Sequence, residues 1–194
     1  MSMAEICYEL RGLAKIVVGC ESFSPASGWP YRQILERLRN DFIACKLPKG
    51  RSVAEEAAKA IVEEYVNYYS NYWIAGLSVT QSALRVSKVK ELKDRVDKLG
   101  AAMEKQLAAE CTNKGSRRPF QDALLLAHWE AQSYNGEQFV DLYDFCDCLE
   151  NRTGSGAIAT QCRQLKKFLK SEFIIKSCYC GPDYQYSYGV SMYF

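Results

Sequence analysis

Histidine is almost missing from this sequence, which contains only His128. A cysteine–histidine enzyme needs an imidazole within hydrogen-bond reach of its thiol, about 3 Å or somewhat more in an unliganded form. His128 lies between Ala127 and Trp129 in a segment with helical periodicity, and nothing nearby resembles a base held by an orienting group. We therefore expect this histidine to have a structural or surface role.

Long apolar runs are lacking as well. No stretch approaches the roughly 18 residues needed to span a bilayer. The first residues, 1–5, have neither the basic start nor the apolar core of a signal peptide. We therefore expect no membrane segment, and a soluble chain that stays in the cytoplasm as it stands.

An excess of charge of one sign is also absent. The 25 Lys and Arg residues against 23 Asp and Glu residues leave a net charge of +2. So balanced a chain gives no electrostatic reason to expect nucleic acid or an anionic membrane as a partner. The 48% hydrophobic content is enough for a globular core, and 194 residues suit one domain or a large part of one.

Disulfide and zinc patterns are missing although cysteine is common. The cysteines are odd in number and scattered, which is unlike a disulfide framework. The two Cys-x-Cys pairs are more closely spaced than zinc ligands usually are, so we expect no metal site. Most of the thiols are interpreted as small buried hydrophobic groups in a reducing compartment. The cysteines are Cys7, Cys20, Cys45, Cys111, Cys146, Cys148, Cys162, Cys178 and Cys180.

What is present is an alternation of helix-like and strand-like segments. The expected helices are 2–13, 31–42, 52–69, 87–99, 101–110, 120–131, 139–149 and 157–169. The expected strands are 14–20, 73–80, 173–177 and 190–194. A capping box of Ser52 and Glu55 is expected to begin one helix. The order predicts an α/β fold in one domain, with helices covering a largely parallel sheet and an exposed loop at 113–119.

Cys20 is the cysteine best placed for chemistry. It ends an expected strand just before a loop, where active sites of α/β sheets gather. A reactive thiolate needs a nearby cation or a helix N-terminus, and the sequence shows neither beside Cys20. We therefore do not expect Cys20 to be a nucleophile.

Five segments follow one another in an order that is typical of one enzyme family. They are MSMAEICYELR at 1–11, AKIVVGCE at 14–21 with GWPY at 28–31, LSV at 77–79 with LRVSKV at 84–89, FVDLYDFC at 139–146, and GVSMYF at 189–194. In this order and spacing they resemble the clostripain family of caspase-like cysteine endopeptidases, and 139–146 is the most specific match. The resemblance covers essentially the whole chain, 1–194, and implies a caspase-like sheet flanked by helices.

The family's catalytic residues have no counterpart in this chain. The nucleophile of the family lies in an Asp-x-Cys motif at the end of a strand, and its histidine lies on a His-Gly turn further upstream. By the match at Met1, both would precede residue 1. The resemblance therefore implies a domain without its catalytic strand, and the apolar strand at 190–194 suggests a second missing part after it.

The loop at 21–29 is where the resemblance places substrate binding. The family loop edges the pocket for a basic P1 side chain, and its pattern is close to E-E-x-x-P-x-D-G-W. Here Glu21 is kept, whereas Ser22 and Ser27 stand where the family has acids. The resemblance thus makes Glu21, Ser27 and Trp29 the candidate substrate-binding residues. Trp29 could offer a ring face to a Lys or Arg stem, or it could simply anchor the following helix as a hydrophobic staple.

Calcium binding is known in this family, but this loop is a poor calcium site. A hard cation wants several carboxylate or carbonyl oxygens, and the loop keeps one glutamate among serines. We therefore expect no cofactor for this chain.

Two functions remain open at this point. In the first, the chain is the C-terminal, heavy-chain-like portion of an endopeptidase that cleaves after Arg or Lys. It would be inactive alone and would need an N-terminal, light-chain-like partner to act on peptide or protein substrates. In the second, it is a catalytically dead relative that serves as a binding or structural module, which the serines at 22 and 27 favour.

Overall fold

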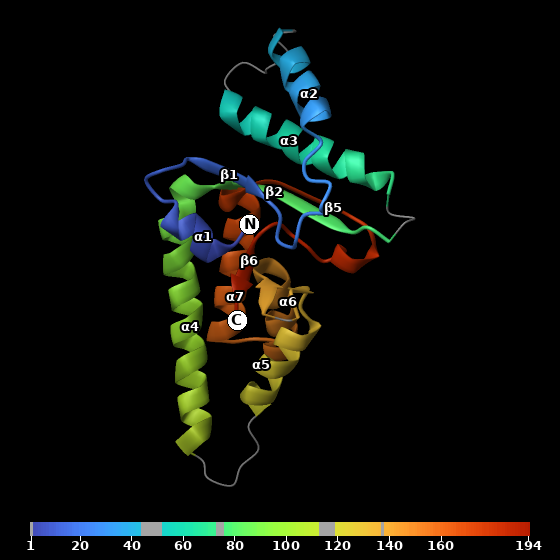
Figure 1. The fold of residues 1–194 in the computed structure, drawn as a ribbon. Helices are drawn as coiled ribbons and strands as arrows, with labels where there is room; N and C mark the ends of the chain where they lie inside the picture. The colour runs from blue at the N-terminus through green and yellow to red at the C-terminus, as the bar shows by residue number, and fades with distance from the viewer. Residues whose placement is uncertain (1, 44–51, 73–75, 113–118, 137) are drawn as a thin grey trace.

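Two small sheets form the centre of the molecule, and helices surround them. The computed structural model describes residues 2–43, 52–72, 76–112, 119–136 and 138–194. The first sheet has the order β1-β2-β5 (Figure 1), and the second has the order β3-β4-β6. The strands are β1 (Ile16–Gly19), β2 (Val79–Arg85), β3 (Ser133–Tyr134), β4 (Phe139–Asp141), β5 (Ile174–Cys180) and β6 (Ser191–Tyr193).

The helices fall into two groups along the chain. The first group is α1 (Ala4–Glu9), α2 (Tyr31–Ile43) and α3 (Val53–Ser70). The second group is α4 (Val89–Thr112), α5 (Pro119–Glu130), α6 (Leu142–Thr153) and α7 (Ala157–Phe168). Short turns adjoin them: η2 (Val86–Lys88), the π-helical η3 (Leu169–Phe173) and η4 (Pro182–Tyr184). The predicted α/β class, with helices flanking a sheet, is confirmed.

The expectation of a largely parallel sheet is wrong. The four strand pairings in the described residues are all antiparallel, and parallel contacts are limited to the isolated bridges Met3–Ser191 and Arg11–Ala14. Alternating helices and strands suggested parallel crossovers. The alternation does not fix how many helices come between two neighbouring strands along the chain. Here β2 and β5 are neighbours in the sheet, yet α4 to α7 all come between them in the sequence.

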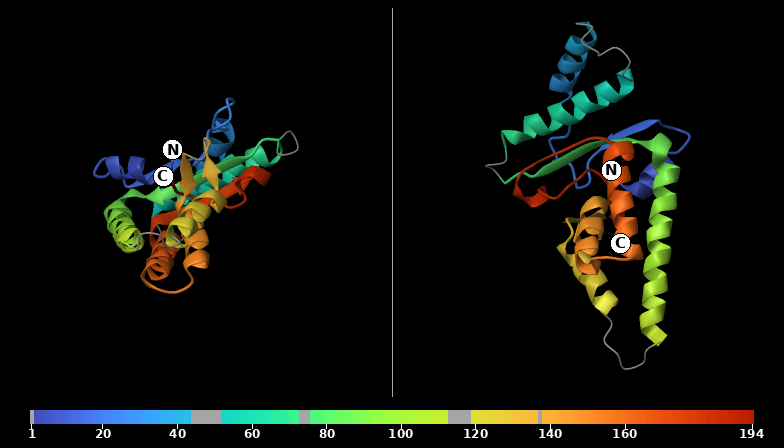
Figure 2. Two further views of the ribbon diagram at one scale, coloured as in Figure 1. Left: turned by 90° about the horizontal axis from the view of Figure 1, so that it is seen from below. Right: turned by 180° about the vertical axis from the view of Figure 1, so that it is seen from behind.

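Strand β2 shows how the first sheet is buried on both faces. Successive residues of a strand point to opposite faces. Ala83 packs with Ala58 and Val62 of α3, whereas Leu84 lies in the main core cluster with buried side chains such as Leu165 of α7. Figures 1 and 2 show the same arrangement, with α2 and α3 beyond one face of the sheet and α4 to α7 on the other.

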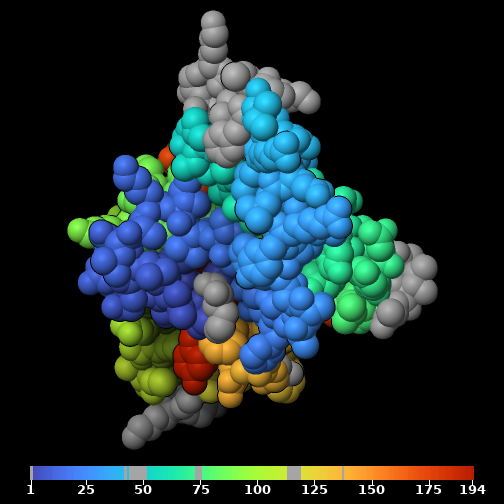
Figure 3. Space-filling view, turned by 45° about the horizontal axis from the view of Figure 1, so that its top comes forward, coloured from blue at the N-terminus to red at the C-terminus, as the bar shows by residue number. Residues whose placement is uncertain are grey.

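The two ends of the chain meet between the two sheets. Ser2 is fully buried, and its N–H donates to the Cys20 carbonyl just after β1 at 2.7 Å. The Ser191 N–H of β6 donates to the Ser2 carbonyl at 2.9 Å, and the Ser82 hydroxyl of β2 donates to Ser2 Oγ at 2.8 Å. The dark blue and red residues accordingly lie on one face of the molecule (Figure 3). Ser2 therefore joins three strands that are far apart in sequence.

Two helix predictions fail for local reasons. The helices expected at 87–99 and 101–110 form one helix, α4, which runs through Gly100. A glycine costs about 1 kcal/mol in a helix interior, and the good helix formers around it together with the buried Leu92 and Leu99 outweigh that cost. The helix expected at 139–149 begins as strand β4, and Asp141 caps α6 by accepting the Asp144 N–H at 2.8 Å.

The predicted capping box at Ser52 is not formed. Ser52 is the N-cap of α3, but its side chain makes no capping hydrogen bond. The Glu55 carboxylate instead binds the Arg85 guanidinium of β2, at 2.6 Å and 3.0 Å. A bidentate pair between two charged groups is stronger than the single carboxylate–amide hydrogen bond that Glu55 would make in the box.

The remaining boundaries differ by short segments. The helix expected at 2–13 is limited to α1, and the strand expected at 173–177 extends to Cys180. The strand expected at 73–80 begins only at Val79 and continues to Arg85; residues 73–75 lie outside the described residues. The expected loop at 113–119 also lies outside them, except for Pro119 at the start of α5. Among the described helices, none has the length and apolarity that a membrane crossing requires.

Candidate substrate-binding site

The loop that follows β1 contains all three candidate substrate-binding residues. It leaves the sheet at Cys20, passes the N-terminal segment and returns to the sheet's α3 side before α2 begins at Tyr31. The structure does not bring the three residues to one point. Ser27 and Trp29 contact α3, whereas Glu21 is directed into the junction of the two sheets.

Ser27 is exposed and is held by the end of α3. Its hydroxyl lies 2.8 Å from the Tyr69 hydroxyl, which in turn donates to the Gly28 carbonyl at 2.5 Å. Gly28 has a φ of +75°, a conformation that glycine adopts without strain. The two hydrogen bonds fix the turn, so the serine takes part in the scaffold that shapes the loop.

Trp29 is half-buried in an aromatic group on α3. Its ring lies 5.8 Å from that of Tyr65 in an edge-on contact and is stacked at 6.4 Å from Tyr31 at the start of α2. The anchoring role that the sequence allowed is therefore present. The ring remains partly accessible, so contact with a ligand is not blocked.

Glu21 is only 2% exposed and lines a small cavity of about 230 Å³. Its backbone N–H donates to Thr80 Oγ1 of β2 at 2.9 Å. Within the described part of the chain, neither carboxyl oxygen has a hydrogen bond of ordinary geometry. Burial, and then the neighbouring Asp141 carboxyl, raise the pKa of Glu21 well above its ordinary value.

Sequence reasoning missed the partners of Glu21, namely Asp141 and Tyr134. Asp141 fell within the helix expected at 139–149, and that expectation gave no reason to pair it with Glu21. The signal that could have located it is the Asp-x-x-Asp spacing of Asp141 and Asp144, which is typical of an N-cap at the start of a helix. No sequence pattern marked Tyr134 as part of a strand, because β3 has only two residues.

The family model of the clostripain family of peptidases matches residues 1–189.

The chain belongs to the clostripain family.

Solved structures of clostripain-family proteins share its fold at low sequence identity. A secreted cysteine protease of Bacteroides thetaiotaomicron, in complex with an irreversible peptide inhibitor, gives a TM-score of 0.59 at 17% identity, with 100% of this chain and 50% of that chain covered. An inactive zymogen from Parabacteroides distasonis gives 0.57 at 18% identity, with 100% and 49% covered. A clostripain from Bacteroides thetaiotaomicron gives 0.58 at 16% identity, with 100% and 74% covered. No curated protein matches the chain.

The clostripain-family chain therefore spans about half the length of the first two structures. Identities below one fifth support the shared fold and no finer property. The caspase-like architecture that the resemblance implied is confirmed by these neighbours.

Cys20 and His128 were considered above as possible catalytic residues. In this member of the clostripain family both have other contacts. The Cys20 thiol donates to the Ser22 carbonyl at 2.8 Å and lies 3.2 Å from Ser24 Oγ. The His128 ring packs 4.5 Å from Phe194, and its Nε2 has no hydrogen-bond partner among the described residues. Neither shows the thiol–imidazole contact that a cysteine peptidase uses.

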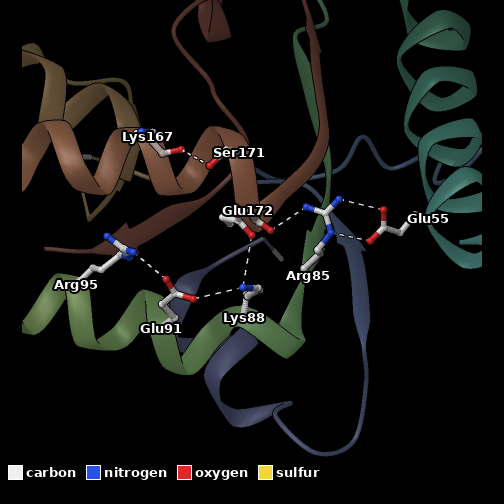
Figure 4. Close-up of polar contacts among 8 residues, drawn as sticks. All are labelled: Glu55, Arg85, Lys88, Glu91, Arg95, Lys167, Ser171 and Glu172. Carbon is white, nitrogen blue, oxygen red and sulfur yellow. Dashed lines mark hydrogen bonds and ion pairs between the residues drawn. The ribbon is translucent and has the colours of Figure 1, made fainter. Parts of the chain in front are cut away.

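A chain of charged residues begins near the N-terminus of α3, away from the loop's aromatic group at Tyr65 and Tyr69, and extends to α4. Figure 4 shows Arg85 bound to the Glu55 carboxylate and to the Glu172 backbone carbonyl. From the Glu172 carboxylate, bases and acids alternate through Lys88 and Glu91 to Arg95. Each charge lies beside one of opposite sign, so the network is balanced internally. This balance fits a role in joining α3, β2, η3 and α4 better than a role in binding a charged ligand.

Proposed function

We propose that this chain is the heavy-chain-like, C-terminal portion of a clostripain-type cysteine endopeptidase that cleaves after Arg or Lys. It is inactive alone and acts when an N-terminal segment supplies the Asp-x-Cys nucleophile and the His-Gly base. The thiolate would attack the scissile carbonyl, the histidine would protonate the leaving amine, and backbone N–H groups would bind the oxyanion.

The observation that carries this proposal is the position of Ser2 beside the edge of β1. In the described residues, β1 pairs on one side only, with β2. The Ser2 N–H is bound to the Cys20 carbonyl at the end of β1. A strand leading into Ser2 would therefore run along the other edge of β1. The backbone N–H and C=O groups on that edge of β1 are unpaired within the described ranges and could form hydrogen bonds with such a strand. By the family resemblance, that strand is the one that ends on the nucleophile.

The substrate-binding residues are part of the same proposal. Trp29 would present its partly accessible ring to the aliphatic stem of a Lys or Arg side chain. Ser27 and Glu21 would shape the loop around it, since Ser27 is bonded to Tyr69 and Glu21 is buried. One of the similar clostripains is in complex with the peptide inhibitor BTN-VLTK-AOMK, whose peptide ends in lysine.

The proposed enzyme would not bind calcium at the loop after β1. The only carboxylate of the loop is Glu21, and both of its oxygens are buried. A hard cation at the loop would therefore have to rely on serine hydroxyls and carbonyls alone. Chelation of calcium should leave the reconstituted activity and the melting temperature unchanged.

Reconstitution tests the proposal. The 194-residue chain would be mixed with a separately produced family N-terminal segment carrying Asp-x-Cys and His-Gly. Amide reporters with Arg, Lys, Leu or Glu at P1 would then be assayed. We expect turnover of the Arg and Lys reporters by the mixture only, and its loss when the nucleophile of the added segment is changed to alanine. Turnover by the chain alone, particularly if Cys20→Ala abolishes it, would refute the proposal.

A second function rests on a different observation. Ser22 and Ser27 stand at acidic positions of the family pattern, and the Ser27 hydroxyl is already bonded to Tyr69. This would suit a catalytically dead relative that binds peptides without cleaving them. In the same reconstitution, binding of an Arg peptide without turnover would support this function over the first.

Expressed as it stands, the chain is proposed to stay in the cytoplasm, whereas one similar structure is described as that of a secreted protease. Cell fractionation of the natural host would decide between the two.

A further inference from the structure

A cluster of buried acidic and hydroxyl groups lies where the two sheets meet. Glu21 follows β1, Asp141 ends β4 and Tyr134 belongs to β3, and all three are at most 4% exposed. The Glu21 carboxyl faces both the Asp141 carboxyl and the Tyr134 hydroxyl. The cluster thus brings together the loop after β1 and both strands of the β3–β4 hairpin.

Asp141 is the better stabilised anion of the two carboxyls. Its Oδ1 accepts the Asp144 N–H at 2.8 Å, and its Oδ2 accepts the Tyr188 and Gly189 N–H groups at 2.7 Å and 3.3 Å. Backbone donors of this kind stabilise the charged form of a carboxylate. Glu21 has no hydrogen bond of ordinary geometry in the described chain, so a buried charge there would be costly.

We propose that Glu21 and Asp141 share one proton, and that this proton makes the pair a pH-sensitive latch that holds the start of the substrate-binding loop against the N-terminus of α6. The protonated Glu21 faces the Asp141 carboxylate and donates its O–H toward it. When the proton leaves, two buried like charges face each other, and the loop must move to let one of them reach water. Glu21 is thus a positioning residue that acts through the loop and not through contact with substrate.

Among the residues that the structure describes, no cation compensates the pair at close range. The groups that face it are Tyr134 from β3, Asp144 and Cys146 from α6, Tyr188 before β6, and the hydroxyls of Thr80 and Ser187. Both Glu21 oxygens are buried, so a dissolved cation cannot reach them without the loop opening. A proton is therefore the ligand that this geometry accommodates.

In the closed state the loop holds Glu21 against Asp141, and in the open state Glu21 reaches water. The direction of the pH dependence follows from the difference in the pKa of Glu21 between these two states. The pKa of Glu21 is raised in the closed state by burial and by Asp141, and it returns to its ordinary value when the loop opens. The closed state is then fully favoured at low pH and loses stability as the pH rises above the ordinary value of 4.5, up to the raised pKa. Over that interval the equilibrium shifts by up to about tenfold per pH unit.

Asp144 must be separated from this effect. Burial raises its pKa to about 6, so its own contribution to the pH dependence ends near that pH. The pH dependence should therefore be measured from about pH 6.5, above the pKa of Asp144, to about pH 8, below the ordinary pKa range of cysteine thiols.

Hydrogen exchange of the loop tests the latch. Exchange at 20–29 would be followed in the 194-residue chain across this window and corrected for the intrinsic pH dependence of exchange. We expect protection of the loop to fall with rising pH in the wild type, by up to about tenfold per pH unit, and to change less than about twofold in Glu21→Gln. The exposed Glu9→Gln is the matched control, and it and Asp144→Asn should keep the wild-type slope above pH 6.5.

Three results would overturn the proposal: a wild-type loop whose protection does not depend on pH, a Glu21→Gln chain with the wild-type slope, or a Glu21→Gln loop that is open at every pH. If Glu21→Gln does not fold, infrared spectra of Asp144→Asn, which lacks the carboxyl whose pKa is about 6, decide the question. A protonated carboxyl band must persist at about pH 6.5; its absence would refute the shared proton. The loop's role in substrate binding rests on the proposed function, but these measurements use no substrate, so either can fail alone.

Discussion

Arg85 of β2 binds the carboxylate of Glu55 on α3 with two hydrogen bonds, from Nε at 2.6 Å and from Nη2 at 3.0 Å, and its Nη1 donates to the Glu172 carbonyl of η3 at 2.8 Å. One guanidinium therefore holds three elements together (Figure 4). Both side chains of the pair are about three-quarters buried, with 27% and 26% exposed, so water screens the interaction only in part.

The first prediction concerns this contact. Arg85→Met keeps most of the apolar stem but leaves the Glu55 carboxylate unpaired, so it should lower the free energy of unfolding by about 1–2 kcal/mol. Urea denaturation would measure the change. Arg32→Met is the control, because the Arg32–Glu36 pair is largely exposed and should contribute little. Equal losses in the two variants would contradict the prediction.

The same contact predicts part of the acid sensitivity. The Arg85 guanidinium lowers the pKa of Glu55 below its ordinary value. A lowered pKa contributes stability that is present above the ordinary value of 4.5 and is lost as the pH falls through the lowered one. Between neutral and strongly acidic pH, the wild type should therefore lose more stability than Arg85→Met. Parallel acid curves for the two proteins would show that Glu55 does not contribute.

Two tyrosines on α3 should respond differently to loss of the hydroxyl. Tyr69 bonds to Ser27 and Gly28, so Tyr69→Phe should cost about 1–2 kcal/mol and loosen the loop. The Tyr65 hydroxyl is buried without a partner in the described chain, and burial raises its pKa to about 12. Tyr65→Phe should therefore be neutral or stabilising. Thermal unfolding of both variants would check this, and the reverse order would show that Tyr65 has a hydrogen-bond partner.

Two glycines form another matched pair. Gly189 has a φ of +121°, and a Cβ there would lie 2.8 Å from the Ser177 Cβ, so Gly189→Ala should be destabilising by more than about 1 kcal/mol. Gly100 lies inside α4 with nothing within 4 Å of an added Cβ, so Gly100→Ala should stabilise the chain by about 0.5–1 kcal/mol. Denaturant midpoints would measure both. A destabilising Gly100→Ala would mean that α4 needs its flexibility at that point.

The edge of β1 predicts how the isolated chain behaves. With one paired side in the described residues, Ile16 to Val18 should exchange their amide protons faster than β2, or the chain should self-associate through this edge. Size-exclusion chromatography and hydrogen exchange would measure this. A monodisperse monomer with strong protection throughout Ile16 to Val18 would instead indicate a self-contained domain.

Sequence reasoning found most elements but not their arrangement. Helical periodicity located α2, α3 and α7, because each buries one stripe of side chains: α3 against the first sheet, α2 against α3, and α7 against α4 and α6. Strand β2 was placed too early because its centre contains the polar Gln81 and Ser82, which are buried in spite of their chemistry. Its burial arises from helices on both faces, and no local pattern encodes that.

The candidate site was predictable only in part. Glu21, Ser27 and Trp29 were singled out by resemblance. A hydrophobic staple would place Trp29 against the helix that follows it, and its ring does stack on Tyr31 at the start of α2. The pairing of Glu21 with Asp141 could not be foreseen, because it joins residues 120 positions apart through a two-stranded hairpin too short to read from the sequence. Contacts of that kind depend on how the two sheets meet.

The hydrogen bonds between Ser2 and Ser191 have a kinetic consequence. They join residues separated by 189 positions, so they close almost the largest loop that the chain allows. Long-range contacts of this kind form late in folding, because the entropy of loop closure opposes them until the rest of the structure is in place. During synthesis, α1 and β1 would leave the ribosome long before β6 exists. Until then the Ser2 carbonyl would lack its donor, the Ser191 N–H, and the second sheet would have no link to the first through the N-terminus.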